Sequence, residues 1–432
     1  MPCLTPRVAR PPRRQRGAAA LVVTMVLFFA MLLIAAFANR GLVFEQRASA
    51  NQYRATQAFE AAEAGLEWAL AQLNNAQPLG ADCRASADAA ALPLRERLLR
   101  YNATAAVHSP LTWNNGGAAA PLQPACVRSD AGWQCSCPAA GHPNLAAPAA
   151  AAGAAQPAFT VQLSASGQPG VLRLSAVGCT SLAGACQPGA AGGAAPDATA
   201  RVQVALALVP GLATLPTAPL TLKDGLAAGA VALGLHNPDA ATGGVVLLAG
   251  GAADAPQARI TTAPGASPVS ALVQGDERLH ARSADSLFAS FFGIDKSTWR
   301  GQSAVRRIGC GGVDCGAALA AALASGHRLL WVDGDLSLAG PLTLGSPDRP
   351  VLIVASGAAR LHGALALHGV VYAGALAWND APNGGFVRGA LVSESGYGGD
   401  AAVDLFYDTA VLERLRGDSG SFTRVPGSWR DF

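Results

Sequence analysis

Residues 18–38 read AAALVVTMVLFFAMLLIAAFA, and this stretch decides the fold of the chain. Its 21 residues carry no charge. As a helix of about 31 Å the stretch would match the hydrocarbon core of a bilayer. No later apolar run has that length, so the sequence predicts a single membrane crossing at most.

A basic leader precedes the apolar stretch and ends in Arg16-Gly17. Such a cluster favours a cytoplasmic N-terminus, so everything after residue 38 is expected outside the cytoplasm. The formal net charge is only +3, and much of the excess lies in the leader. We therefore expect no nucleic-acid partner.

The apolar stretch continues into an amphipathic helical pattern over residues 39–75. Phe59, Leu66 and Leu73 recur at helical spacing, and Asn74-Asn75 followed by Pro78 predicts the end of the helix. Within the apolar part, the hydroxyl of Thr24 is expected to bond to its own helix backbone. The apolar stripe is expected to pack on a folded domain.

Two segments carry a family resemblance: RQRGAAALVV (14–23) and FEAAEAGLEWALAQLN (59–74). They resemble the N-terminal region of PilX-type minor pilins of the type IV pilus. The resemblance implies that a prepilin peptidase cuts between Gly17 and Ala18 and methylates Ala18. It also implies an inner-membrane protein with a periplasmic ectodomain that later enters the pilus or reaches the cell surface. The implied partners are other minor and major pilins, the assembly platform, the peptidase and membrane lipid.

Two positions depart from the major-pilin pattern. Ala18 stands where Phe is usual, and Val22 occupies the fifth mature position, where Glu is usual. A Glu in an apolar helix is costly unless paired, and in pilins it is thought to meet a neighbour's terminal amine. Val22 has no such charge, which favours a minor, tip-located subunit like the Glu-lacking K-type pseudopilins. An uncleaved signal anchor is the alternative interpretation of the N-terminus.

Cysteine usage indicates an oxidising compartment. Cleavage after Gly17 would remove Cys3 and leave eight cysteines on the exported side. The pairs 179/186 and 310/315 are expected to staple loops, and the other four leave three connectivities open. Disulfides are favoured over a zinc site at Cys135-Ser-Cys137, because the spacing is not CxxC and no suitably spaced His follows. The disulfide candidates are Cys83, Cys126, Cys135, Cys137, Cys179, Cys186, Cys310 and Cys315.

The chain after the helix is predicted to be rich in β-strands. Alternating strands at 159–163, 171–174 and 201–208 predict a small antiparallel sheet, whereas 138–158 reads as a linker or surface loop. From about residue 216, short apolar strands are headed by glycine, which favours a β-solenoid. These strands are 218–222, 334–338, 340–344, 363–367, 369–373, 374–378 and 389–393, with helices expected at 283–293 and 315–325.

The predicted fold class is α+β. The predicted segments are a leader (1–17), a transmembrane or filament helix (18–38), its amphipathic continuation (39–75), a pilin-like antiparallel β region (76–215) and a Gly-rich β-solenoid-like domain (216–432).

No catalytic motif is found: the sequence lacks HExxH, GxSxG, a Walker loop and a strand–GxGxxG–helix. We predict no enzyme, no cofactor and no metal, with Asp333 and Asp335 as calcium candidates if the Asp-Gly-Asp is more than a turn. Trp331, Trp378 and Trp429 are either core anchors or part of a glycan surface. His362 and His368 would face one another if they lay in adjacent solenoid strands, but a solvated strand face is the preferred interpretation.

The function predicted from the sequence is that of a minor pilin in pilus assembly or priming, with the tip as its candidate position. The alternatives are a pilus-displayed adhesin for a surface or glycan, and a K-like minor pseudopilin of type II secretion. A β-helix hydrolase on a signal anchor is disfavoured, because an acidic cluster is missing.

Overall fold

The computed structural model describes residues 16–88, 90–149, 156–168, 170–189, 195–226, 232–253 and 258–431. The chain divides into two compact units, Met1–Gln57 and Ala58–Phe432, and each is described by itself. Most of the predicted leader, Cys3 and part of the predicted 138–158 linker lie outside the described residues.

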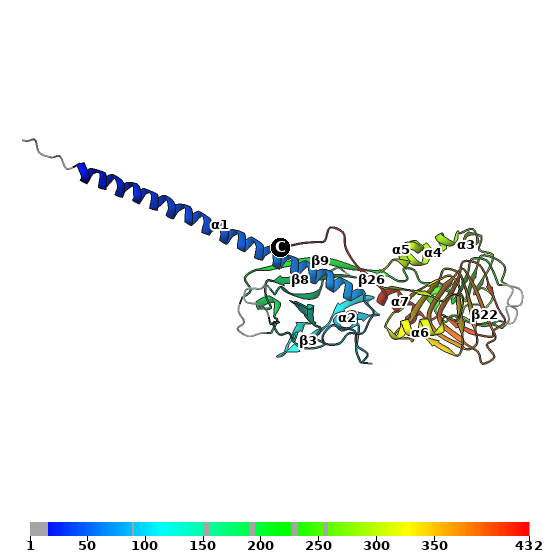
Figure 1. Ribbon diagram of the computed structural model, residues 1–432. Coiled ribbons are helices and arrows are strands. Elements are labelled where there is room, and N and C mark those ends of the chain that lie inside the picture. Colours follow the sequence, from blue (N-terminus) through cyan, green and yellow to red (C-terminus); the bar gives the residue numbers. More distant parts are fainter. Residues whose placement is uncertain are drawn as a thin grey trace, which may run out of the picture. The chain divides into compact units, whose positions relative to one another are not determined.

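One helix, α1 (Arg16–Asn74), covers both halves of the predicted helical pattern (Figure 1). No proline interrupts its 59 residues. The side chains are exposed from Gly17 to Thr56, and one face is buried from Ala58 onward. The long N-terminal helix predicted from the sequence is therefore confirmed.

The second unit contains a six-stranded antiparallel sheet with the order β26-β9-β8-β7-β5-β6. Its strands are β5 (Ala125–Ser129), β6 (Gly132–Ser136), β7 (Ala158–Ala165), β8 (Val171–Cys179), β9 (Thr199–Pro210) and β26 (Gly420–Arg424). The α1 residues Ala62, Leu66 and Leu73 share one buried core with Phe159 and Leu174 of this sheet. The sequence prediction of a small antiparallel sheet packed on the long helix is thus confirmed.

Strand β26 comes from the C-terminal end of the chain. Gly420 pairs with Pro210 and Phe422 with Leu208, and Phe422 is buried in the sheet's core. The sequence predicts one Gly-rich domain over residues 216–432. The last strand of that range, β26, belongs to the antiparallel sheet instead. Residues 211–419 are an insertion between two neighbouring strands.

Residues 76–121, which show little pattern in the sequence, form short elements beside the sheet. These are α2 (Leu94–Leu98), β1 (Leu99–Asn102), β2 (Val107–Pro110), β3 (Thr112–Asn115) and β4 (Ala118–Pro121). The strands pair as two-stranded hairpins, β1 with β2 and β3 with β4. A 3-10 turn, η1 (Gly184–Cys186), lies between β8 and β9.

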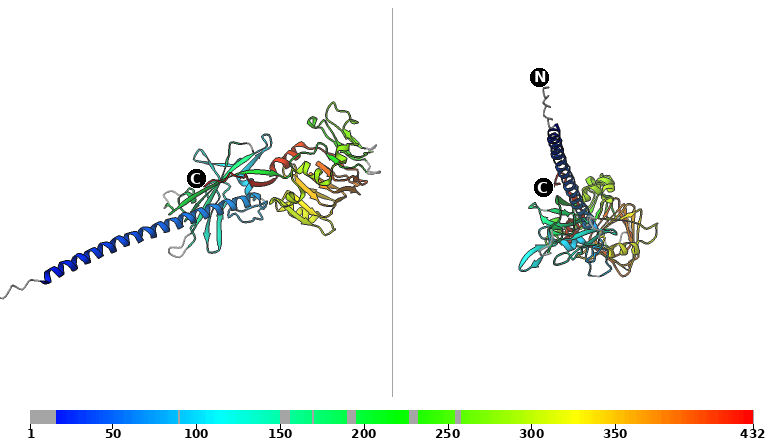
Figure 2. Two further views of the ribbon diagram at one scale, coloured as in Figure 1. Left: turned by 90° about the horizontal axis from the view of Figure 1, so that it is seen from above. Right: turned by 60° about the vertical axis from the view of Figure 1, so that its left-hand side comes forward.

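The insertion is a parallel β-solenoid with three walls, seen as the stacked strands of Figures 1 and 2. The first wall contains β15 (Val305–Gly309), β16 (Leu329–Asp333), β19 (Val351–Ala355), β10 (Leu220–Leu222), β12 (Leu247–Ala249) and β14 (Leu272–Val273). The second wall contains β17 (Leu336–Ala339), β20 (Ala358–His362), β22 (Ala375–Asn379) and β24 (Tyr397–Gly398). The third contains β18 (Leu342–Leu344), β25 (Asp404–Phe406), β11 (Gly234–His236) and β13 (Arg259–Thr261).

Two long strands, β21 (Leu365–Ala373) and β23 (Phe386–Ser393), belong to both the first and the third wall. The sequence expectation that Gly369 and Gly389 begin strands is wrong, because both lie inside these strands, at the corner. A Cβ on Gly369 would lie 1.8 Å from the Val351 carbonyl oxygen. Glycine is therefore required by close backbone approach rather than by a strand start.

Inward-facing aliphatic side chains form one column along the first wall. Each residue of this column is paired in register with the next, and all of them contact the solenoid core: Leu330, Ile353, Val371, Leu391, Leu220, Leu247 and Leu272. The order along the wall is not the chain order. β10, the first strand of the insertion, pairs with β23, which comes near the end of the insertion. β15, from the middle of the insertion, forms one edge of the wall.

Helices cover the outside and one end of the solenoid. They are α3 (Glu277–His280), α4 (Ala284–Phe292), α5 (Lys296–Arg300), α6 (Gly316–Ala324) and α7 (Thr409–Asp418), with a 3-10 turn η2 (Ala240–Thr242). α4, α5 and α7 bury their apolar sides on the outer face of the first wall. α6 packs against the solenoid core through Leu319 and Ala322. The helices expected at 283–293 and 315–325 are α4 and α6.

Candidate functional site

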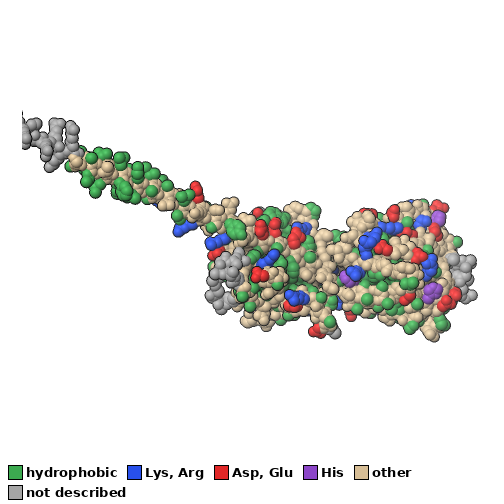
Figure 3. Space-filling view, in the orientation of Figure 1, with side chains coloured by type: hydrophobic (Ala, Val, Ile, Leu, Met, Phe, Trp, Pro, Cys, Tyr) green, Lys and Arg blue, Asp and Glu red, His purple; other side chains and the backbone are tan. Residues whose placement is uncertain are grey.

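Residues 18–38 of α1 present an exposed apolar surface, whereas the exposed residues from Arg40 to Thr56 also include charged side chains. Phe28, Ile34 and Phe37 have 66%, 69% and 81% of their surface exposed. Figure 3 shows hydrophobic side chains along this part of the helix. Because burying one such side chain is worth about 1.5–3 kcal/mol, a surface of this size requires a cover of lipid or protein.

Within the described residues, α1 is the one helix long and apolar enough to span a membrane. Thr24 is a polar residue within the apolar part of this helix. Its hydroxyl is placed to donate to the backbone carbonyl oxygens of Ala20 and Leu21, at 3.0 and 2.9 Å. This confirms the expectation for Thr24. Val22 is exposed and offers no charge on this surface.

The positions expected at the processing site lie at the start of the same helix. Gly17 and Ala18 are exposed in the first turn of α1. A Cβ placed on Gly17 would meet nothing within 4 Å. Both residues are therefore exposed within the first unit.

Comparison with known proteins gives one match, to the family described as PilX N-terminal, over residues 16–67. This range covers the apolar surface and the start of the buried half of α1. Residues 16–67 are thus similar to the N-terminal helix of PilX-like type IV pilins. No curated protein and no solved structure matches the chain.

The family is structural and non-enzymatic, and a PilX-like pilin associates with other pilins. The single apolar helix fits a single-pass membrane anchor. The match ends at residue 67, so what the β-solenoid of this chain does must be argued from its own residues.

The two calcium candidates lie on either side of the corner between β16 and β17. Asp333 accepts from the Trp331 ring nitrogen at 2.9 Å and pairs with Arg300 and Arg307 at 3.0 and 3.2 Å. These contacts hold the pKa of Asp333 below its usual value, although burial opposes the shift. The two arginines thus occupy the carboxylate oxygens that would bind calcium. This favours a structural turn over a calcium site at Asp333.

Asp335 is bonded separately from Asp333. It pairs with Arg360 at 2.6 Å and accepts from the backbone N–H of Ala358 at 2.9 Å. The hydrogen bond from Arg360 is the main cause of its lowered pKa. In the described parts of the chain, no group of three or more His, Cys, Asp or Glu side chains is placed to hold a metal.

The tryptophans singled out in the sequence divide by burial. Trp378 is fully buried and donates to the Gly363 carbonyl oxygen at 3.0 Å, and Trp331 is buried against Trp299. Trp429 is 45% exposed and contacts Phe59 edge-on. Two of the three are therefore core anchors.

The histidines His362 and His368 do not face one another. His362 pairs in register with Asn379 on the second wall, and His368 with Arg388 on the third. They are six residues apart, but a corner of the solenoid separates them. Gly363 and Gly369 lie at two corners of one coil, so the condition for facing side chains is not met.

Four disulfides join the eight candidate cysteines. They connect Cys83 to Cys137, Cys126 to Cys135, Cys179 to Cys186 and Cys310 to Cys315. Cys126 and Cys135 are register partners on β5 and β6. Cys310–Cys315 links the end of β15 to the start of α6.

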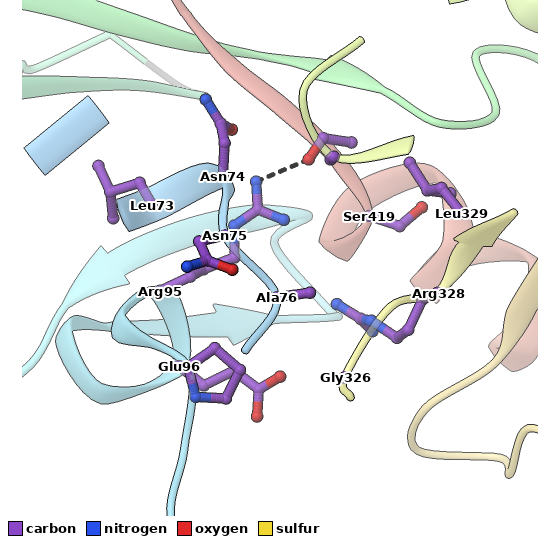
Figure 4. Close-up of a pocket in the computed structure, with 13 residues that line it drawn as sticks. Leu73, Asn74, Asn75, Ala76, Arg95, Glu96, Gly326, Arg328, Leu329 and Ser419 are labelled. Atoms are coloured by element: carbon purple, nitrogen blue, oxygen red, sulfur yellow. Dashed lines mark hydrogen bonds between the residues drawn. The ribbon is translucent and has the colours of Figure 1, made fainter. Parts of the chain in front are cut away.

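A charged cluster that was not predicted from the sequence joins the sheet to the solenoid inside the second unit. Asp418, at the end of α7, pairs with Arg328 at 3.0 Å and with His108 of β2 at 3.3 Å. Burial raises the pKa of Asp418, but the contacts with His108 and Arg328 outweigh it and lower the pKa to about 2. Arg95 of α2 lies beside this cluster (Figure 4). We call Arg95, His108, Arg328 and Asp418 the junction cluster.

Arg328 and Asp418 lie more than 200 residues from Arg95 in the chain. No local sequence motif therefore predicts that these three side chains lie close together. The one usable signal is the Arg95–Glu96–Arg97 run next to buried leucines, which is unusual for a solvated face.

Proposed function

We propose that this chain is a minor pilin that is processed at Gly17–Ala18 and enters the type IV pilus through α1. The observation that carries the proposal is the exposed apolar helix that matches the PilX N-terminal family and packs its C-terminal part on a six-stranded antiparallel sheet. Before assembly the helix anchors the protein in the inner membrane with the second unit in the periplasm. In the filament it packs against the helices of other pilins.

Its position in the filament is proposed to be the tip. Val22 cannot pair with a neighbour's terminal amine, so this subunit lacks a contact that shaft subunits use. The insertion of residues 211–419 also makes the second unit larger than a six-stranded sheet alone. A tip subunit needs neighbours on one side only, which suits both features and a role in priming assembly.

The first test is the N-terminal peptide mass of the membrane-fraction protein, with and without prepilin peptidase. We expect a methylated Ala18 terminus only when the peptidase is present. The variant Gly17→Val should keep its leader, whereas the matched control Gly41→Val, at an exposed glycine of the same helix, should be processed normally. An intact Met1 leader in both strains would make the protein a signal-anchored β-domain and end the proposal.

Deletion of the gene tests the role. Loss of piliation favours the assembly and priming role. Intact pili with lost attachment would favour the alternative, an adhesin that displays the β-solenoid. Intact pili with lost protein secretion would favour the K-like pseudopilin.

A further inference from the structure

A small cavity lies within the second unit, at the junction cluster. It is lined by the end of α1, by α2, by the segments before β15 and β16, and by the turn between α7 and β26 (Figure 4). Its volume is about 40 Å³. This is room for one or two water molecules or one monatomic ion.

Arg95 supplies a buried positive charge to this cavity. The residue is only 9% exposed. Burial, with the nearby Arg328, lowers the pKa of Arg95 to about 10, so the guanidinium remains charged at neutral pH. The charge must therefore be balanced inside the protein.

The protein groups around Arg95 balance its charge incompletely. One Nη donates to the Gly420 carbonyl oxygen at 2.9 Å, and the guanidinium lies 4.5 Å from the centre of the Phe422 ring. Its Nε is buried and has no hydrogen-bond partner among the described residues. A buried donor without a partner is costly.

Against the larger effect of burial, both nearby carboxylates raise the pKa of Arg95 from a distance, but each is bonded to another cation. Glu96 forms an ion pair with Arg349, with an N–O distance of 3.2 Å. Asp418 is shared by Arg328 and His108. No carboxylate is bonded directly to Arg95 within the described residues.

We propose that the cavity is a binding site for one chloride-sized anion held next to Arg95, with Arg328 on the opposite side. The anion supplies the missing counter-charge for the buried guanidinium. Because the cavity walls come from both the sheet and the solenoid, the bound anion stabilises their junction. This site is independent of the pilin role proposed above.

The first test is thermal unfolding of the full chain in detergent. Chloride is compared with gluconate, which is too large for the cavity, at equal ionic strength. We expect chloride to raise the transition midpoint in a saturable way by about 3 °C, since a ligand that binds only the folded state stabilises it. Equal midpoints in the two salts would overturn the proposal.

The second test uses Arg95→Gln, with the exposed Arg100→Gln as its matched control for loss of one positive charge. The chloride effect should vanish in Arg95→Gln and persist in Arg100→Gln. A chloride effect of the same size in both variants would contradict the assignment.

A third measurement needs no variant and so does not depend on the folding of Arg95→Gln. In wild-type crystals grown with bromide, an anomalous peak is expected in this cavity, in direct contact with an Arg95 nitrogen. Bromide peaks elsewhere but none in this cavity would refute the site.

Discussion

Gly178 lies where β8 crosses α1 and sets how closely the two elements pack. A Cβ at this position would lie 2.1 Å from the carbonyl oxygen of Ala58 and 2.3 Å from the backbone nitrogen of Ala62. Both obstacles are backbone atoms, so no side-chain rotation relieves the clash. The small residues of α1 and this glycine therefore act together.

We expect Gly178→Ala to destabilise the second unit by about 2 kcal/mol or more, because α1 must move away from the sheet. The measurement is the denaturant midpoint of the full chain in detergent. Gly309→Ala is the matched control, since a Cβ there meets nothing within 4 Å and should change stability little. A Gly178→Ala midpoint equal to that of the control would show that the helix tolerates displacement.

Asp418 makes stability depend on pH. Its pKa is lowered to about 2 from the ordinary value of 3.8, so it stabilises the fold above pH 4, and this contribution is lost as the pH falls toward 2. A shift of this size corresponds to about 2 kcal/mol.

In Asp418→Asn, stability at pH 6 should fall, and the loss of stability between pH 4 and pH 2 should be smaller than in the wild type. Chemical unfolding at several pH values measures both. Asp130→Asn, at an exposed position, is the control. An unchanged acid profile in Asp418→Asn would show that the pairing with Arg328 and His108 does not control the acid response.

At the scale of elements, a side chain of α1 bonds to the free edge of the six-stranded sheet, which is formed by β26. The Asn74 side chain bonds both backbone groups of Phe422, accepting from its N–H at 2.7 Å and donating to its carbonyl oxygen at 2.9 Å. The end of α1 therefore occupies the outer edge of β26. An edge protected in this way does not pair with another strand.

The disulfides also act at this scale, and their effects should differ with the length of chain they close. Cys83–Cys137 spans 54 residues and Cys310–Cys315 spans 5. In the chain-entropy picture, removing them costs about 4 and about 2 kcal/mol. We expect Cys83→Ala/Cys137→Ala to lower the unfolding midpoint more than Cys310→Ala/Cys315→Ala does. The reverse order would show that the short staple holds α6 on the solenoid core by more than loop closure.

For the whole molecule, the decisive feature is that the solenoid is inserted between two paired strands. Because Gly420 pairs with Pro210, and the Gly211 N–H donates to the Ser419 carbonyl oxygen at 3.1 Å, the two ends of the insertion are neighbours. Replacing residues 212–418 with Asn-Gly would give a two-residue hairpin between β9 and β26.

We expect the shortened chain to form Cys83–Cys137 and Cys126–Cys135, to be processed, and to restore piliation in a deletion strain. Disulfide mapping by mass spectrometry and electron microscopy of cells are the measurements. A chain that forms both disulfides but leaves the cells without pili would show that the solenoid itself is needed for assembly.

The sequence alone determined the long helix, the α+β class, the antiparallel sheet and the positions of α4 and α6. These features follow from local signals: an uncharged run of membrane length, helical and alternating periodicities, and terminating Asn and Gly residues. The apolar surface that the family match identifies could also be predicted, because it is contiguous in the chain.

The sequence predicts the pairs Cys179–Cys186 and Cys310–Cys315, and both are confirmed. Only the tertiary structure decided the pairing of the other four cysteines, the coil order, the return of β26 to the sheet and the junction cluster. Each depends on residues far apart in the chain, such as Arg95 with Gly420, or β10 with β23. No local pattern encodes such pairs, because their free energy comes from burial and charge pairing that exist only after the chain has folded.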